Sequence, residues 1–272
     1  MIYFVGAGPG SEDLITVRGQ RYLTEADIVI YAGSLVNPGL LKYTKEGCRI
    51  YNSAHMTLPE VVQVMEEGEK AGKMTVRLHT GDPSLYGAIR EQMEELEKRK
   101  ISYEVCPGVS SFCGAAAALS LEYTLPGISQ SVIITRAEGR TAVPERESLR
   151  SFAAHQATMV LFLSSGLAEE VSRELMNGGY APDTPAAVVY KATWPEEKKL
   201  VTTLSELPGK MKEEGISRTA LIIVGNVINS EFERSKLYDP GFTTGYRKGT
   251  DSTEVPAAGK EIRYESRNDR LQ

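Results

Sequence analysis

The sequence predicts an α/β protein built from two α/β domains. Short apolar runs rich in Val and Ile alternate with segments of helical periodicity, which is typical of layered α/β folds. At 272 residues the chain can hold a large core, and this length favours two domains. The composition, 41% hydrophobic and 25% charged, is that of an ordinary globular protein.

Eight apolar runs are the expected strands: residues 2–5, 27–31, 74–78, 102–105, 131–134, 158–163, 186–190 and 220–224. Helices are expected between them, including residues 57–71 and 88–99. The first of these begins with Thr57 and Glu60 in capping-box spacing, with Pro59 in the first turn. The second carries charge pairs typical of a solvated face.

A break in the pattern near residues 119–130 predicts the domain boundary. The small residues at 114–118 either allow close backbone packing or are simply good helix formers. A Thr-Leu-Pro-Gly linker follows at 124–127, and a new strand begins at Ser131. We therefore expect an N-terminal domain at 1–120 and a C-terminal domain at 121–248. The tail at 249–272 lacks apolar periodicity, so we expect it to be disordered or loosely attached.

Charge and composition limit the classes of function. A net charge of −5 argues against broad electrostatic binding to nucleic acid or to anionic lipid. The three cysteines lack metal-type spacing and suit a reduced, cytoplasmic protein. Met1 leads straight into a strand, so no signal peptide is expected, and the apolar runs are too short to span a bilayer.

Neither a metal site nor a covalent nucleophile is predicted. The histidines, His55, His79 and His155, lie in different kinds of element, without a second ligand motif beside them. No Gly-x-Ser-x-Gly elbow occurs, and Cys106 precedes Pro107 with no obvious base nearby.

The glycine-rich loop at residues 5–10 follows the first strand and resembles a dinucleotide loop only superficially. Ser11 stands where the fingerprint needs a glycine, and Pro9 removes an amide donor. The second strand also lacks an acidic residue at its end. We interpret the loop as a close backbone approach to a small ligand that need not carry phosphate.

Two more strands end in loops of the same kind. Residues 80–86 contain Asp82, which fits either a ligand loop or an ordinary turn and helix cap. Residues 107–111 are a Pro-Gly turn followed by Ser110 and Ser111, which could cap a helix or contact a ligand. Loops at the carboxyl ends of neighbouring strands line one edge of a sheet, so the set predicts a ligand crevice.

The second half of the chain offers cationic candidates. Arg136 and Arg140 flank a glycine after a strand, a pattern that suits bidentate binding of carboxylates or, equally, a solvated loop. Lys191 lies beside the only tryptophan, Trp194, which could instead pack a corner between the domains.

Taken together, these motifs resemble the tetrapyrrole (corrin/porphyrin) methylases, which use S-adenosylmethionine. The resemblance covers roughly residues 1–248 and rests on five segments: 5–10, 13–16, 81–83, 107–109 and 220–225. It implies two α/β domains with a ligand cleft between them, usually in a homodimer. It also implies a small-molecule tetrapyrrole substrate, without nucleic acid or membrane, and S-adenosylhomocysteine as the second product.

The resemblance also assigns residues. Those expected to contact the cofactor are Pro9, Thr80, Gly81, Asp82, Leu85, Tyr86, Ser110, Ser111, Leu163, Ala192 and Leu221. Those expected to bind substrate carboxylates are Arg136 and Arg140 and, as weaker candidates, His79, Lys191 and Arg18. No catalytic residue is assigned, because transfer of a sulfonium methyl group needs no protein nucleophile.

Departures from the pattern narrow the substrate. Relatives that methylate uroporphyrinogen typically have Tyr-Asp in the second strand and Gly-Gly-Asp-Pro in the central loop. Here Tyr31 precedes Ala32, and Thr80 replaces the first glycine, which disfavours that substrate. The alternatives are a methylase of another ring carbon or of uroporphyrinogen III, one acting on protein or RNA, a non-catalytic corrinoid-binding protein, and a nicotinamide dehydrogenase, which Ser11 disfavours.

Overall fold

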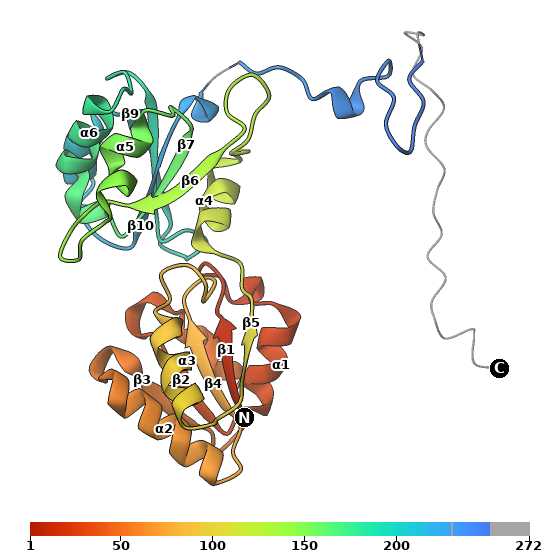
Figure 1. Ribbon diagram of the computed structural model, residues 1–272, viewed down its shortest axis with the longest axis vertical. Coiled ribbons are helices and arrows are strands. Elements are labelled where there is room, and N and C mark those ends of the chain that lie inside the picture. Colours follow the sequence, from red (N-terminus) through yellow and green to blue (C-terminus); the bar gives the residue numbers. More distant parts are fainter. Residues whose placement is uncertain (230, 251–272) are drawn as a thin grey trace. The chain divides into compact units, whose positions relative to one another are not determined.

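The computed structural model describes residues 1–229 and 231–250. Residues 1–231 form one compact unit that contains two five-stranded sheets (Figure 1). The segment from 232 onward forms a separate unit, and in its described part the Arg247 guanidinium donates hydrogen bonds to the carbonyl oxygens of Leu237 and Asp239. Within these ranges no helix has both the length and the apolar character needed to cross a membrane.

The first sheet is entirely parallel, with strand order β3-β2-β4-β1-β5. Helix α1 packs on one face and helices α2 and α3 pack on the other (Figure 1). Both faces are therefore buried, which explains the nearly continuous apolar runs in its central strands. The strands are β1 (Ile2–Gly6), β2 (Ile28–Tyr31), β3 (Arg49–Asn52), β4 (Thr75–His79) and β5 (Tyr103–Cys106), and the helices are α1 (Val17–Glu25), α2 (Leu58–Lys70) and α3 (Ile89–Lys98).

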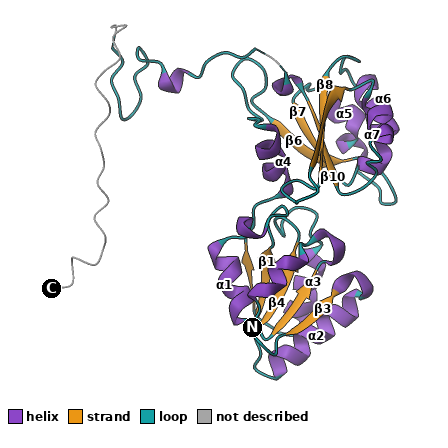
Figure 2. Cartoon of the chain, turned by 180° about the vertical axis from the view of Figure 1, so that it is seen from behind, coloured by secondary structure: helices purple, strands orange, loops and turns teal. Residues whose placement is uncertain are grey.

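The second sheet is mixed, with strand order β6-β7-β10-β8-β9, in which only β6 and β7 pair in parallel (Figure 2). Helices α5, α6 and α7 cover one face, and α4 covers the other. The strands are β6 (Val132–Arg136), β7 (Thr158–Phe162), β8 (Pro185–Tyr190), β9 (Lys198–Thr203) and β10 (Ala220–Val224), and the helices are α4 (Ser111–Leu119), α5 (Leu149–Ala153), α6 (Ala168–Asn177) and α7 (Leu207–Glu213).

The predicted α/β architecture with two sheets is confirmed, and all eight expected strands are present within about two residues of their expected bounds. Two strands, β3 and β9, were not predicted. Both are edge strands with largely exposed side chains, such as Ile50 and Val201 at 44% and 50% exposure. An edge strand does not need a continuous apolar run, so the search for such runs overlooked them.

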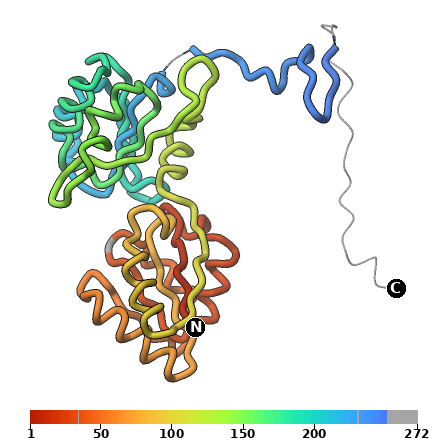
Figure 3. The backbone as a smooth tube through the Cα atoms, viewed as in Figure 1, coloured from red at the N-terminus to blue at the C-terminus, as the bar shows by residue number. Residues whose placement is uncertain are grey.

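Helix α4 links the two sheets along the chain, as the tube in Figure 3 shows. Ala115 is fully buried in the same cluster as Val160, Val189 and Leu221 of the second sheet. A Cβ atom on Gly114 would lie 2.8 Å from Cβ of Pro9, so at this position a small residue allows close packing. The boundary expected at 120/121 remains a prediction, and the expected tail lies, from residue 251 on, outside the described residues.

Candidate functional site

Three loops meet at the carboxyl ends of β4, β1 and β5, which are neighbours in the first sheet. Their glycines pack backbone against backbone: a Cβ atom on Gly108 would lie 2.2 Å from the carbonyl oxygen of Gly81 and 2.7 Å from Cα of Gly6. The amide of Gly81 also donates to the carbonyl oxygen of Gly8 at 2.9 Å. The close backbone approach expected at residues 5–10 is thus made with neighbouring loops, and of those residues Pro9 lines the pocket described below.

The Asp82 carboxylate holds two of these loops together. One oxygen accepts hydrogen bonds from the amide and hydroxyl of Ser84, and the other accepts the amide of Gly108 at 2.8 Å. Burial acts to raise the pKa of Asp82, but the hydrogen bonds from Ser84 and Gly108 outweigh it, so the pKa lies below its usual value. Both carboxylate oxygens are therefore engaged within the protein, which favours the loop-fixing role for Asp82.

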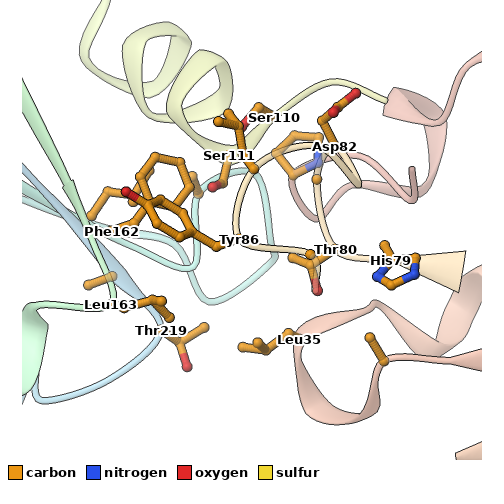
Figure 4. Close-up of a pocket in the computed structure, with 18 of the residues that line it drawn as sticks. Leu35, His79, Thr80, Asp82, Tyr86, Ser110, Ser111, Phe162, Leu163 and Thr219 are labelled. Carbon is orange, nitrogen blue, oxygen red and sulfur yellow. The ribbon is translucent and has the colours of Figure 1, made fainter. Parts of the chain in front are cut away.

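A pocket of about 270 Å³ opens beside these loops, with walls from both sheets (Figure 4). The first sheet contributes the loop at residues 80–87, the start of α4 adds Ser110 and Ser111, and the second sheet contributes residues that lie in or next to β7, β8 and β10. Every position assigned to the cofactor lines it: Pro9, Thr80, Gly81, Asp82, Leu85, Tyr86, Ser110, Ser111, Leu163, Ala192 and Leu221. Their roles remain predictions, but the fold brings all of them to one cavity.

The expected substrate residues divide into two groups. His79 and Lys191 line the pocket. Arg18, Arg136 and Arg140 are not among the described residues that line it. The Arg136 guanidinium donates to the carbonyl oxygens of Thr141 and Ala142, at 3.0 and 2.7 Å, and so closes its own loop.

Lys191 and Trp194 form a cationic corner of the pocket. The Lys191 ammonium lies 5.2 Å from the centre of the indole ring and 3.3 Å from a carboxylate oxygen of Glu196. The Trp194 indole donates to the carbonyl oxygen of Pro9 at 3.2 Å and packs against Gly10. Trp194 therefore joins the halves of the chain, as the packed-corner interpretation expected, and also lines the pocket.

Sequence reasoning missed several lining residues, among them Arg77, Phe162 and Thr219. Arg77 belongs to an expected strand, and Phe162 ends another. The Phe162 ring lies 5.4 Å from the ring of Tyr86, so an aromatic pair joins the two sheets across the pocket (Figure 4). Position at a strand end was the available signal for Phe162 and Thr219. Arg77 lies just before the loop at residues 80–86, but the sequence predicted no binding role for it.

Unfavourable backbone conformations collect at this pocket. Four of its non-glycine lining residues have positive φ: Tyr86 (56°), Leu163 (53°), Lys191 (47°) and Thr219 (56°). Each such residue costs on the order of 1 kcal/mol and persists where the surrounding structure enforces it, which happens most often at functional sites.

Comparison with known proteins agrees with this geometry. The family described as Tetrapyrrole (Corrin/Porphyrin) Methylases matches residues 1–208. The cobalt-precorrin-4 C(11)-methyltransferase of Methanocaldococcus jannaschii is 54% identical over 248 residues, which are 91% of this chain and 96% of that protein.

Two solved structures are also similar. A cobalt precorrin-4 methyltransferase superposes with a TM-score of 0.82 at 48% identity, over 84% of this chain and 96% of that one. The uroporphyrin-III C-methyltransferase of Thermus thermophilus, complexed with S-adenosyl homocysteine, gives 0.71 at 27% identity, over 84% and 98% of the two chains. The fold is that of a two-domain α/β methyltransferase. The chain belongs to the tetrapyrrole (corrin/porphyrin) methylases.

Proposed function

We propose that this protein methylates C11 of cobalt-precorrin-4, with S-adenosylmethionine as the methyl donor, in the biosynthesis of cobalamin. The observation that carries the proposal is the 54% identity to a cobalt-precorrin-4 C(11)-methyltransferase over 96% of that relative. The sequence motifs agree, because Tyr31 to Val36, Thr135 to Arg140 and Lys191 to Pro195 resemble that member of the family most.

The pocket suits the donor. The Thr80 hydroxyl is buried without a hydrogen-bond partner among the described residues, and Thr80 lines the pocket, so a small rotation of its side chain would let the hydroxyl bind a polar group of a ligand. Ser110 and Ser111 supply further hydroxyls at the start of α4, and Leu85 and Leu221 supply apolar surface. A ligand that combines an amino acid, a nucleoside and a sulfonium centre needs this mixture of surfaces.

When bound, S-adenosylmethionine supplies an electrophilic methyl group that an electron-rich ring carbon can accept by in-line displacement. The contribution of the protein is to hold donor and acceptor collinear and to exclude water, which supplies up to roughly 7–11 kcal/mol in favourable systems. The Tyr86 and Phe162 rings and the strained loop at Leu163 form walls able to restrict both ligands.

Charge in the pocket suits a polycarboxylate acceptor. The protein is acidic overall, yet the charged lining residues are Arg77, Lys191 and Asp82, and the Asp82 carboxylate is engaged by Gly108 and Ser84. Among the described lining residues the two cations therefore outnumber the one carboxylate, and Arg77 is the cation without an ion-pair partner, because Lys191 is paired with Glu196. Arg136 and Arg140 belong to this proposal as rim contacts: Arg136 pairs in register with Phe162, so it lies one strand from the pocket wall.

A homodimer and a cytoplasmic location complete the proposal. The homodimer is expected from the resemblance to the family, and the cytoplasmic location is expected from the three cysteines, Cys48, Cys106 and Cys113, whose free state agrees with a reducing compartment. Sedimentation velocity over a range of protein concentrations tests the oligomeric state.

Mass spectrometry of the tetrapyrrole tests the function. Pure protein is incubated with S-adenosylmethionine and, in separate reactions, cobalt-precorrin-4, precorrin-4 and uroporphyrinogen III. We expect one added methyl group on cobalt-precorrin-4 and none on uroporphyrinogen. Methylation of uroporphyrinogen would contradict the assignment to cobalt-precorrin-4 while leaving the family unchanged. Tetrapyrrole binding without any methylation would favour a corrinoid-binding protein. Fragment analysis of the product locates the methylated carbon.

A further inference from the structure

Strand β4 places two basic side chains side by side at the edge of the pocket. Arg77 and His79 are two residues apart, so they point to the same face of the first sheet. They are 7% and 3% exposed, and both line the cavity. In Figure 4, His79 and Leu35 lie on one side of the close-up and Phe162 and Tyr86 on the other.

Arg77 is a buried cation without a counter-ion. Its Nε donates to Oε1 of Gln92 at 3.1 Å, and its Nη1 donates to the carbonyl oxygens of Ile30 and Leu78, at 3.1 and 3.4 Å. All of these acceptors are neutral, and no described carboxylate forms an ion pair with Arg77. Burial lowers the pKa of the guanidinium to about 10, so it stays charged at neutral pH. Its second terminal nitrogen, Nη2, makes no hydrogen bond to a described residue.

His79 is a buried polar side chain whose Nε2 has no partner among the described residues. Its Nε2 is inaccessible and makes no hydrogen bond to a described residue. Burial, together with the charge of Arg77, lowers the pKa of the imidazole to about 3, so the ring is neutral at pH 7 and can donate one N–H. Burying an unpaired polar group destabilises a protein, so its presence at a cavity wall requires an explanation.

A bound carboxylate would offset both energetic costs, that of the buried Arg77 charge and that of the unpaired His79 side chain. It would pair with the guanidinium through Nη2, in the short charge-assisted geometry that such groups prefer, and it would accept the imidazole N–H once the His79 ring turns its donor toward the cavity. Gln92 stabilises this arrangement, because its amide donates to the carbonyl oxygen of Ala88 at 3.0 Å and so keeps Oε1 turned toward Arg77.

We propose that Arg77 and His79 form a carboxylate subsite that binds one peripheral carboxylate of the tetrapyrrole and so orients the macrocycle relative to the methyl donor. This inference rests on the proposed function. It assigns substrate recognition to Arg77, for which the sequence predicted no binding role, and it pairs His79 with that residue.

Steady-state kinetics with cobalt-precorrin-4 tests the subsite in the Arg77→Met and His79→Leu variants. Arg90→Met is the matched control, since it removes one exposed cation that is ion-paired with Glu97 at 3.1 Å outside the pocket. We expect KM for the tetrapyrrole to rise about tenfold or more in both test variants, the effect of losing one hydrogen bond to a charged group. KM for S-adenosylmethionine should stay within about twofold, and the control should resemble wild type.

Thermal unfolding of the ligand-free variants separates substrate binding from a structural role. Because His79→Leu replaces an unpaired polar group by an apolar one of similar size, we expect an equal or higher Tm. A marked fall in Tm for this variant, or an unchanged tetrapyrrole KM in both variants, would overturn the subsite while the proposed function stood. A wild-type protein that neither binds nor methylates a tetrapyrrole would overturn both.

Discussion

The hydrogen bonds of Asp82 lead to a quantitative prediction for Asp82→Ala. The substitution removes the acceptors of two backbone amides, Gly108 N and Ser84 N, which both lie 2.8 Å from a carboxylate oxygen. A hydrogen bond to a charged group contributes about 1.5–3 kcal/mol, and the partial exposure of Asp82 favours the low end of this range. We therefore expect a loss of about 3 kcal/mol in the free energy of unfolding, or roughly 6–12 °C in Tm for a unit of this size.

Binding of S-adenosylmethionine should weaken as well, because Thr80 and Gly81 lie in the loop that Asp82 fixes. If half of the lost energy has to be regained when the ligand orders the loop, Kd rises about tenfold. Urea unfolding measures the first effect and calorimetric titration measures the second. Asp82→Asn keeps one acceptor oxygen and should fall between wild type and Asp82→Ala. Unchanged stability together with lost binding would refute this reasoning and indicate that the carboxylate contacts the ligand directly.

Three further predictions concern stability, pH and binding. Gly108→Ala would place a Cβ atom 2.2 Å from the Gly81 carbonyl oxygen, so the free energy of unfolding should fall by about 3 kcal/mol, as at the upper end of other overpacking changes. Gly209→Ala is the control, because Gly209 lies in open space in α7, and urea unfolding should show a gain of up to about 1 kcal/mol. The pKa of His79 is about 3 in the folded protein and 6.5 in the unfolded chain, so the protein loses stability as the pH falls below 6.5. The free energy of unfolding should fall by roughly 2 kcal/mol between pH 7.5 and pH 5, and His79→Leu should lack this loss. Arg136→Ala should weaken tetrapyrrole binding and spare S-adenosylmethionine binding in paired titrations, and equal loss of both would mean that Arg136 acts only by closing its loop.

The cofactor loops could be predicted because their signal is local. Each consists of an apolar strand followed by glycine or proline, and the carboxyl ends of parallel strands share one edge of a sheet. The pairing of β4 with β1 and of β1 with β5 then brings Gly81, Gly8 and Gly108 together without any further information. The resemblance to a family extended the same logic to Leu163, Ala192 and Leu221, which local patterns alone would not have selected.

The cationic residues were harder to predict, because charge in a sequence carries no information about its partner. Arg136 and Arg140 looked like a carboxylate clamp, but the Arg136 guanidinium binds carbonyl oxygens of its own loop. Arg77 looked like one more residue of a buried strand. Whether an arginine faces a carboxylate, a carbonyl or a cavity depends on elements distant in the chain, here Gln92 and the carbonyl of Ile30.

The sequence by itself determined the central strands, the main helices, the three loops and the family, since these follow from periodicity, turn residues and motif order. Only the tertiary structure decided that β3 and β9 complete the sheets as edge strands and that the Asp82 carboxylate joins two loops. It also decided that, among the described residues, Arg77 lines the pocket without a counter-ion and His79 Nε2 has no hydrogen-bond partner. The physical reason is that burial and hydrogen-bond pairing are properties of contacts between distant segments. The pattern of side chains along a strand predicts which residues share a face of the sheet, but the packing of the two sheets decides which face borders a cavity.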